Sequence, residues 1–228
     1  MCTIAAVFAP TELVIFDCDG VLVDSEPLAR EIIGEMLAEL GWSLTPDEIV
    51  EKFVGRSVRS NTATIEAHLG RPLPVGWLDE LLTRVWAAHD AHLGPVDGIG
   101  EALAGIDALG LTTCVATSGS HDKTEHSLRH VGLYEYFAGR VFSASEVPHG
   151  KPAPDLFLHA AATIGVAPAA CVVIEDSQYG AQAARAAGMR CIGYSGGLTP
   201  AEWLAGRDTV VVDDLRKIPE LLASAESW

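Results

Sequence analysis

Two short clusters of acidic residues are the first candidates for chemistry in this chain. Asp17 and Asp19 come directly after an apolar run near the N-terminus, and Glu175 and Asp176 come directly after another apolar run. Two carboxylates ~4 Å apart repel by about 1 kcal/mol in water and about 4 kcal/mol at an effective dielectric constant of about 20. Mg²⁺ suits such a donor set, since it binds a few carboxylate oxygens together with waters and a phosphate. We therefore expect a Mg²⁺ site at Asp17, Asp19, Glu175 and Asp176.

Three further residues would complete a site for phosphoryl transfer. Ser118 and Gly119 form a turn after a third apolar run, and Lys151 lies in a loop before a helical segment. Lys151 would hold a phosphate oxygen, and the Ser118 hydroxyl and the Gly119 N–H would donate to the phosphate. Asp17 would attack as nucleophile, while Asp19 would act as general acid and then as general base. Each signal alone is typical of an ordinary turn or surface residue, but their combination beside predicted strand ends favours a catalytic site.

The elements that must bring these residues together alternate along the chain. Short apolar runs rich in β-branched residues predict strands, and amphipathic segments predict helices between them. Because the strands are apolar on both faces, we predict an α/β fold with a doubly wound, Rossmann-like parallel sheet. Ligands of such sheets bind beyond the carboxyl ends of the strands, where the candidate residues lie. The predicted strands are 13–16, 111–116, 140–143, 171–174, 190–194 and 209–212, and the predicted helices are 98–109, 123–131, 155–164 and 179–187.

Residues 25–94 break this alternation, because they show helical patterns and no convincing strand. The expected helices are 27–40, 46–53, 58–69 and 76–91. We therefore expect an inserted helical cap domain at 25–94 and an α/β core domain made of residues 1–24 and 95–228. Such a cap would close over the site and exclude bulk water.

Composition narrows the classes of partner. The formal net charge of −16 would repel nucleic acid and anionic membranes, so we expect neither as a partner. No apolar run approaches the ~20 residues of a membrane helix. The five cysteines form no CxxC pair, and three lie in predicted strands, which is typical of reduced core residues in a cytoplasmic protein. We expect a monomer that acts on a small phosphorylated metabolite.

Four motifs resemble those of the haloacid dehalogenase superfamily. The segment 17–21 (DCDGV) resembles motif one, 117–119 (TSG) motif two, 151–152 (KP) motif three and 175–176 (ED) motif four. The helical block resembles the four-helix cap of the subgroup that contains β-phosphoglucomutase and sugar-phosphate phosphatases. The resemblance implies that Asp17 is the nucleophile, that Asp19 is the acid/base and supplies a backbone carbonyl to Mg²⁺, and that Asp176 binds Mg²⁺ directly. It also implies that the substrate is a phosphate ester, because relatives that dehalogenate lack the acid at position 19.

The resemblance leaves two reactions open. Val21, the pair 177–178 and the run 151–155 resemble the mutase, which would return the phosphoryl group to a bisphosphorylated sugar. However, residues 24–30 (DSEPLAR) lack the early cap histidine of the mutase and are closer to phosphatases of the 6-phosphogluconate type. We favour a phosphatase that forms an aspartyl-phosphate on Asp17, with a β-phosphoglucomutase-type isomerase as the alternative. A protein that keeps the fold without catalysis is disfavoured because the acids and Lys151 are intact.

Three residues outside the core motifs are further candidates for substrate contact by resemblance. Arg56 lies in the segment 53–57, which matches the specificity loop of the subgroup's cap. Glu26 and Asp122 align near substrate positions of the family. The identity of the phosphate ester does not follow from these residues.

Overall fold

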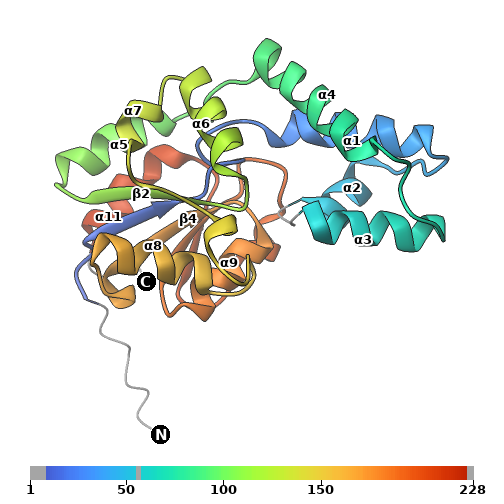
Figure 1. The fold of residues 1–228 in the computed structure, drawn as a ribbon. Coiled ribbons are helices and arrows are strands. Elements are labelled where there is room, and N and C mark those ends of the chain that lie inside the picture. The colour runs from blue at the N-terminus through green and yellow to red at the C-terminus, as the bar shows by residue number, and fades with distance from the viewer. Residues whose placement is uncertain (1–8, 55–57, 225–228) are drawn as a thin grey trace, which may run out of the picture.

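Six parallel strands form the sheet that positions the candidate residues. The computed structural model describes residues 9–54 and 58–224. The strand order is β3-β2-β1-β4-β5-β6, and every neighbouring pair is parallel (Figure 1). This arrangement confirms the predicted α/β fold. The strands are β1 (Leu13–Phe16), β2 (Thr112–Thr117), β3 (Val141–Ser143), β4 (Cys171–Glu175), β5 (Arg190–Tyr194) and β6 (Thr209–Val212).

The central strand β1 explains why the sheet needs helices on both faces. Side chains alternate along a strand, so Val14 and Phe16 enter one hydrophobic cluster while Leu13 and Ile15 enter another. All four are fully buried. Helices α5, α6, α7 and α11 contribute to the first cluster, and α8, α9 and α10 to the second. These helices are α5 (Ile99–Ala108), α6 (His121–His130), α7 (Tyr134–Phe137), α8 (Asp155–Ile164), α9 (Gln178–Ala186), α10 (Ala201–Leu204) and α11 (Ile218–Ala223).

Four helices between β1 and β2 form a separate lobe beside the sheet (Figure 1). They are α1 (Glu26–Glu39), α2 (Pro46–Phe53), α3 (Val58–Leu69) and α4 (Trp77–His92). α2 begins with a capping box, in which the Thr45 hydroxyl accepts from the Glu48 N–H and the Glu48 carboxylate accepts from the Thr45 N–H. The apolar faces of the four helices meet in a hydrophobic cluster of their own, which includes Ile32, Ile33, Met36, Leu37, Ile49, Phe53, Ile65 and Trp77. This cluster supports the cap domain expected at 25–94, whose status as an independent domain stays a prediction.

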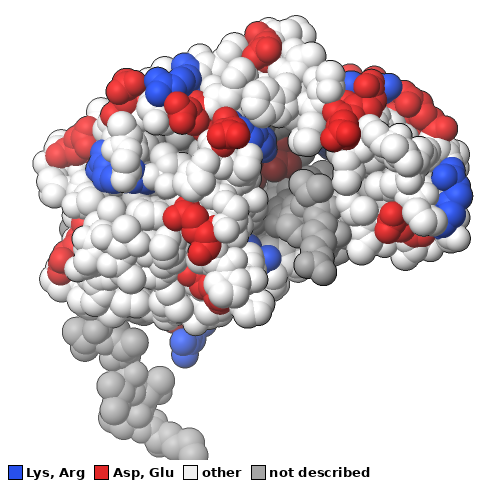
Figure 2. Space-filling model, viewed as in Figure 1, with Lys and Arg blue, Asp and Glu red and all other residues white. Residues whose placement is uncertain are grey.

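The two segments that join this lobe to the sheet are paired with each other. The Asp24 N–H donates to the Gly94 carbonyl at 2.9 Å, and the Val96 N–H donates to the Leu22 carbonyl at 3.2 Å. The chain therefore leaves and re-enters the sheet-containing part at one place. Figure 2 shows acidic side chains spread over both parts and a hollow in the surface between them.

Most predicted elements differ from the observed ones by no more than two residues at either end. The prediction missed α7, α10 and α11, because helices of four to six residues are too short to show a period. It also missed three short 3₁₀ turns, η1 (Ala144–Glu146), η2 (Pro168–Ala170) and η3 (Leu215–Lys217).

The cysteines within the described residues match the expectation of reduced core residues. Cys18, Cys114, Cys171 and Cys191 are buried and free. Among residues 9–54 and 58–224, no helix is both long and apolar enough to cross a membrane. The cytoplasmic location and the monomeric state stay predictions.

Candidate active site

Adjacent strands bring the two acidic clusters together at the carboxyl edge of the sheet. Asp17 follows β1, and Glu175 is the last residue of the neighbouring strand β4. The Asp17 N–H donates to the Ile174 carbonyl at 2.9 Å, which continues the ladder beyond β1. Carboxylate oxygens of Asp17, Glu175 and Asp176 lie within 4.8 Å of one another. All three residues are buried, so these carboxylates meet in a site of low dielectric.

Gly20 allows the loop after β1 to approach Asp176 closely. Its φ is +81°, and a Cβ built there would lie 2.1 Å from Asp176 Oδ2. A side chain at position 20 would therefore displace the Asp176 carboxylate and strain the loop. The glycine that ends the DxDG motif thus has a steric role in the acidic cluster.

Lys151 joins the two acidic clusters through its ammonium group. Its Nζ donates to Asp17 Oδ1 at 2.6 Å and to Glu175 Oε1 at 2.7 Å, and only 3% of its side chain is exposed. The second oxygen of Glu175 accepts from the Ser177 N–H at 2.7 Å and from the Ser177 hydroxyl at 2.8 Å. Glu175 therefore holds Lys151 in place, and Lys151 holds Asp17.

The carboxyl groups around Lys151 would carry more negative charge than one ammonium group can neutralise. Burial raises the pKa of Asp17 to about 7 against the opposing charge of Lys151. Burial, followed by the negative charges of Glu175 and Glu26, raises the pKa of Asp176 well above its ordinary value. An oxygen-binding divalent cation would favour the ionised forms of these groups. The chemistry and the spacing of Asp17, Glu175 and Asp176 are thus compatible with a divalent cation such as Mg²⁺.

Asp19 is oriented by two residues that the sequence did not indicate as its partners. The Ser25 hydroxyl donates to Asp19 Oδ1 at 2.6 Å, and Lys123 Nζ donates to Asp19 Oδ2 at 2.7 Å. Burial by itself would raise the pKa of Asp19, but the Lys123 charge and the two hydrogen bonds hold it below its ordinary value. In this conformation Asp19 is therefore an ionised, paired carboxylate.

Glu26, the first residue of α1, faces the same acidic region. Burial, followed by the negative charge of Asp19, raises the pKa of Glu26 to about 7, and Lys123 opposes the shift. The structure therefore places this predicted substrate residue beside the general acid/base candidate.

Within the described part of the chain, the structure shows no hydrogen bond between the remaining predicted site residues and the acidic cluster. Ser118 is exposed after β2, and the Gly119 N–H donates to Thr117 Oγ1 at 3.0 Å. To bind phosphate, this N–H would have to exchange its partner, so the phosphate role of both residues stays a prediction. Asp122 is exposed in the first turn of α6. Arg56 lies outside the described residues.

Lys123 is the functional candidate that sequence reasoning missed. It lies in the first turn of α6, four residues after Gly119, and its side chain is 29% exposed. The available signal was its position, since the start of a helix that follows a strand lies at the carboxyl edge of the sheet. Together with Lys151 it supplies the local positive charge that a phosphate site needs in so acidic a protein.

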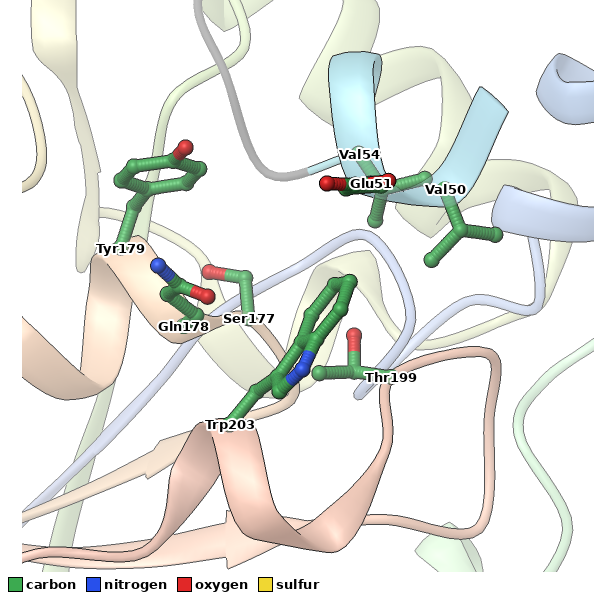
Figure 3. Close-up of a pocket in the computed structure, with 8 residues that line it drawn as sticks. All are labelled: Val50, Glu51, Val54, Ser177, Gln178, Tyr179, Thr199 and Trp203. Atoms are coloured by element: carbon green, nitrogen blue, oxygen red, sulfur yellow. The ribbon is translucent and has the colours of Figure 1, made fainter. Parts of the chain in front are cut away.

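A cavity of about 320 Å³ adjoins the acidic cluster between the helical lobe and the sheet-containing part. Side chains from the end of α2 face side chains from the start of α9 and from α10 across it (Figure 3). Ser177 lines the cavity and also binds Glu175, so the cavity adjoins the acidic cluster. Its lining residues are Val50, Glu51, Val54, Ser177, Gln178, Tyr179, Thr199 and Trp203.

This chain is similar in sequence to known hydrolases. The sequence profile of the haloacid dehalogenase-like hydrolase family matches residues 11–188. The 6-phosphogluconate phosphatase of Escherichia coli is 32% identical over 179 residues, which cover 78% of this chain and 80% of that protein.

Two solved structures match almost the whole chain. A haloacid dehalogenase-like protein of unknown function from Agrobacterium tumefaciens is 36% identical with a TM-score of 0.81, and the match covers 93% of this chain and 98% of the other. A hydrolase of the same family from Deinococcus radiodurans, solved with bound phosphate and sodium, is 32% identical with a TM-score of 0.77. That match covers 95% of this chain and 97% of the other.

Proposed function

Because this chain belongs to the haloacid dehalogenase-like hydrolase family, we propose that it is a Mg²⁺-dependent phosphatase for a small phosphorylated metabolite, in particular a sugar phosphate. The observation that carries the proposal is the position of Lys151, which binds Asp17 and Glu175 beside the carboxylate cluster. A buried carboxylate next to a buried ammonium and a cation site is suited to attack a phosphate dianion.

Asp17 is the nucleophile in this proposal. One of its carboxylate oxygens forms a bond to phosphorus while the bond from phosphorus to the alcohol oxygen breaks, and Asp19 donates a proton to that oxygen. Water then attacks the phosphorus of the aspartyl-phosphate, Asp19 accepts its proton, and inorganic phosphate leaves Asp17. Lys151 stabilises the charge on the phosphoryl oxygens throughout. Asp17, Glu175, Asp176 and the Asp19 carbonyl would hold Mg²⁺, which would supply further charge neutralisation.

The proposal requires Asp19 to change partners during the reaction. In the structure its two oxygens bind Ser25 and Lys123, and its pKa is lowered, so it carries no proton for the leaving group. Ser25 immediately precedes α1 and belongs to the linker of the helical lobe. We therefore include in the proposal that residues 25–94 move as a cap and that this movement takes Ser25 away from Asp19. Lys123, which lies on α6 outside the cap, must release Asp19 as well.

Asp17→Asn tests the nucleophile. The amide cannot form the aspartyl-phosphate, so we expect kcat for phosphate release to fall by about 1,000-fold or more. The assay is release of inorganic phosphate from a panel of phosphorylated metabolites with Mg²⁺. Mass spectrometry of acid-quenched wild-type enzyme should show a phosphoryl adduct on the peptide that carries Asp17.

Asp47→Asn is the matched control, because it makes the same change at an exposed position in α2. Its phosphate release should equal that of the wild type. Unchanged release by Asp17→Asn, or an adduct on another peptide, would contradict the mechanism.

The isomerase alternative has its own test. The protein is incubated with β-glucose 1-phosphate and a trace of the corresponding bisphosphate. We expect free phosphate from the phosphatase. Glucose 6-phosphate formed without free phosphate would support the isomerase and exclude the phosphatase.

A further inference from the structure

We propose that the cavity between α2 and the starts of α9 and α10 binds the non-phosphorylated end of the substrate, and that it selects an uncharged, hydroxyl-bearing chain over a chain that ends in a carboxylate. The inference rests on the proposed function, because it assigns the substrate class of the same site. A volume of about 320 Å³ is large enough for a short sugar chain.

The position of the cavity links it to the reaction centre. Ser177 lines it and donates two hydrogen bonds to Glu175, which in turn binds Lys151 beside Asp17. Gln178 and Tyr179 follow in the first turn of α9 and also line the cavity. In this proposal, a substrate with its phosphoryl group at Asp17 extends its other end toward these side chains.

The walls match the two kinds of surface on a sugar chain. Val50, Val54 and Trp203 offer apolar surface to C–H groups, and the indole offers a flat face (Figure 3). Gln178 and Thr199 carry uncharged polar groups that can donate to and accept from hydroxyls. Such a mixture of apolar surface and a few convergent polar groups is typical of a site for a small ligand.

Glu51 determines the preference for an uncharged end. Among the described residues that line the cavity, Glu51 alone carries a charged side chain. This side chain comes from α2 on the helical lobe (Figure 3). Its carboxylate can accept hydrogen bonds from hydroxyls but repels a second carboxylate. At a separation of about 4 Å in water, this repulsion corresponds to a roughly fivefold change in an equilibrium constant.

A matched pair of substrates tests the inference. Sorbitol 6-phosphate and 6-phosphogluconate are linear six-carbon phosphates that differ at the far end, where one has an alcohol and the other a carboxylate. We expect kcat/KM for sorbitol 6-phosphate to be at least about fivefold higher. In Glu51→Gln the ratio should fall below about twofold, because the repulsion is removed. Asp47→Asn, on the same helix but away from the cavity lining, should keep the wild-type ratio.

Trp203 provides a second readout. Trp203→Ala should raise KM for sorbitol 6-phosphate by about tenfold, and Trp203→Phe should restore most of the loss because it keeps an aromatic face. Circular dichroism establishes that each variant folds. A ratio that is the same in wild type and Glu51→Gln would overturn the inference, as would a preference of the wild type for 6-phosphogluconate.

Acetyl phosphate separates failure of the inference from failure of the proposed function. This acyl phosphate lacks the six-carbon chain that the proposal places in the cavity, so its hydrolysis by the wild type with Mg²⁺ reports the chemistry at Asp17. Hydrolysis of acetyl phosphate without discrimination between the six-carbon esters would overturn the inference alone. No hydrolysis of acetyl phosphate or of either six-carbon ester would overturn the proposed function as well.

Discussion

Lys123 is paired with Asp19 across 104 positions of the sequence, and the two side chains are only 29% and 19% exposed. Such a pair differs physically from a surface ion pair, because loss of one partner leaves the other charge poorly solvated. Asp19 would then keep only the hydrogen bond from Ser25. The pair therefore contributes to stability as well as to the charge of the site.

Lys123→Met should lower the free energy of unfolding by about 1–2 kcal/mol, which is less than for a fully buried pair because both groups retain some solvent. Urea denaturation measures this difference. Lys217→Met is the control, since Lys217 pairs with Asp213 on the surface at 56% and 73% exposure and should change stability by less than about 0.5 kcal/mol. An equal loss in both variants would contradict this account.

At the scale of the residue, the acids could be predicted because they follow apolar runs whose carboxyl ends share an edge. Lys151 could be predicted from its place in a loop before a helical segment. Lys123 could not be predicted, because a lysine in a polar helix has the pattern of a solvated side chain. The partner of such a lysine is decided by packing between distant segments, which leaves no local signal.

The first turn of α9 forms one wall of the reaction centre. A Cβ built at Gly180 would lie 1.7 Å from Glu175 Oε1, so the glycine lets the helix backbone lie against this carboxylate. The same oxygen accepts from Lys151, and the other oxygen accepts from Ser177. Packing of one helix turn thus determines where the central carboxylate lies.

Gly180→Ala should displace Glu175, lower the free energy of unfolding by about 1–3 kcal/mol and reduce phosphate release, because Lys151 loses a fixed partner. Gly100→Ala in α5 is the matched control: it meets open space, and helix propensity should make it neutral or stabilising by up to about 1 kcal/mol. Thermal unfolding and kcat report the two effects. If Gly180→Ala behaved like Gly100→Ala, Glu175 would not be held by this contact.

At the scale of the element, periodicity predicted the strands and the long helices because burial imposes a regular pattern on them. α10 was missed, and with it the position of Trp203, because four residues are too few to show a helical period. The cavity could not be predicted either, because its walls come from elements that are distant in sequence.

At the scale of the whole molecule, the acidic cluster is a local concentration of the charge that gives the chain its net −16. The raised pKa values of Asp17 and Asp176 show that native packing opposes their ionisation. A cation that binds the folded state and not the unfolded state relieves this opposition.

Mg²⁺ at about 100 times its dissociation constant should therefore stabilise the protein by about 2.7 kcal/mol. For a chain of this size, this corresponds to an increase of roughly 5–10 °C in melting temperature. Removal of the metal with a chelator should reverse the increase. Asp176→Asn should lose most of the Mg²⁺-dependent increase in melting temperature. In the absence of metal, this variant should unfold at a higher temperature than the wild type, because one buried carboxyl group is neutralised. An equal Mg²⁺ response in both proteins would contradict the assigned ligands.

The pairing of the two linkers has a consequence for how such enzymes can diversify. Because Asp24 and Gly94 are hydrogen-bonded neighbours, the lobe between them is joined to the rest of the protein by one pair of adjacent linkers. Its hydrophobic cluster is separate from the two clusters beside the sheet. An exchange of this lobe for another insert would leave the nucleophile, its lysine and the metal acids in place. Recombination at this pair of linkers could thus change which substrate is recognised without replacing the catalytic residues of the sheet-containing part.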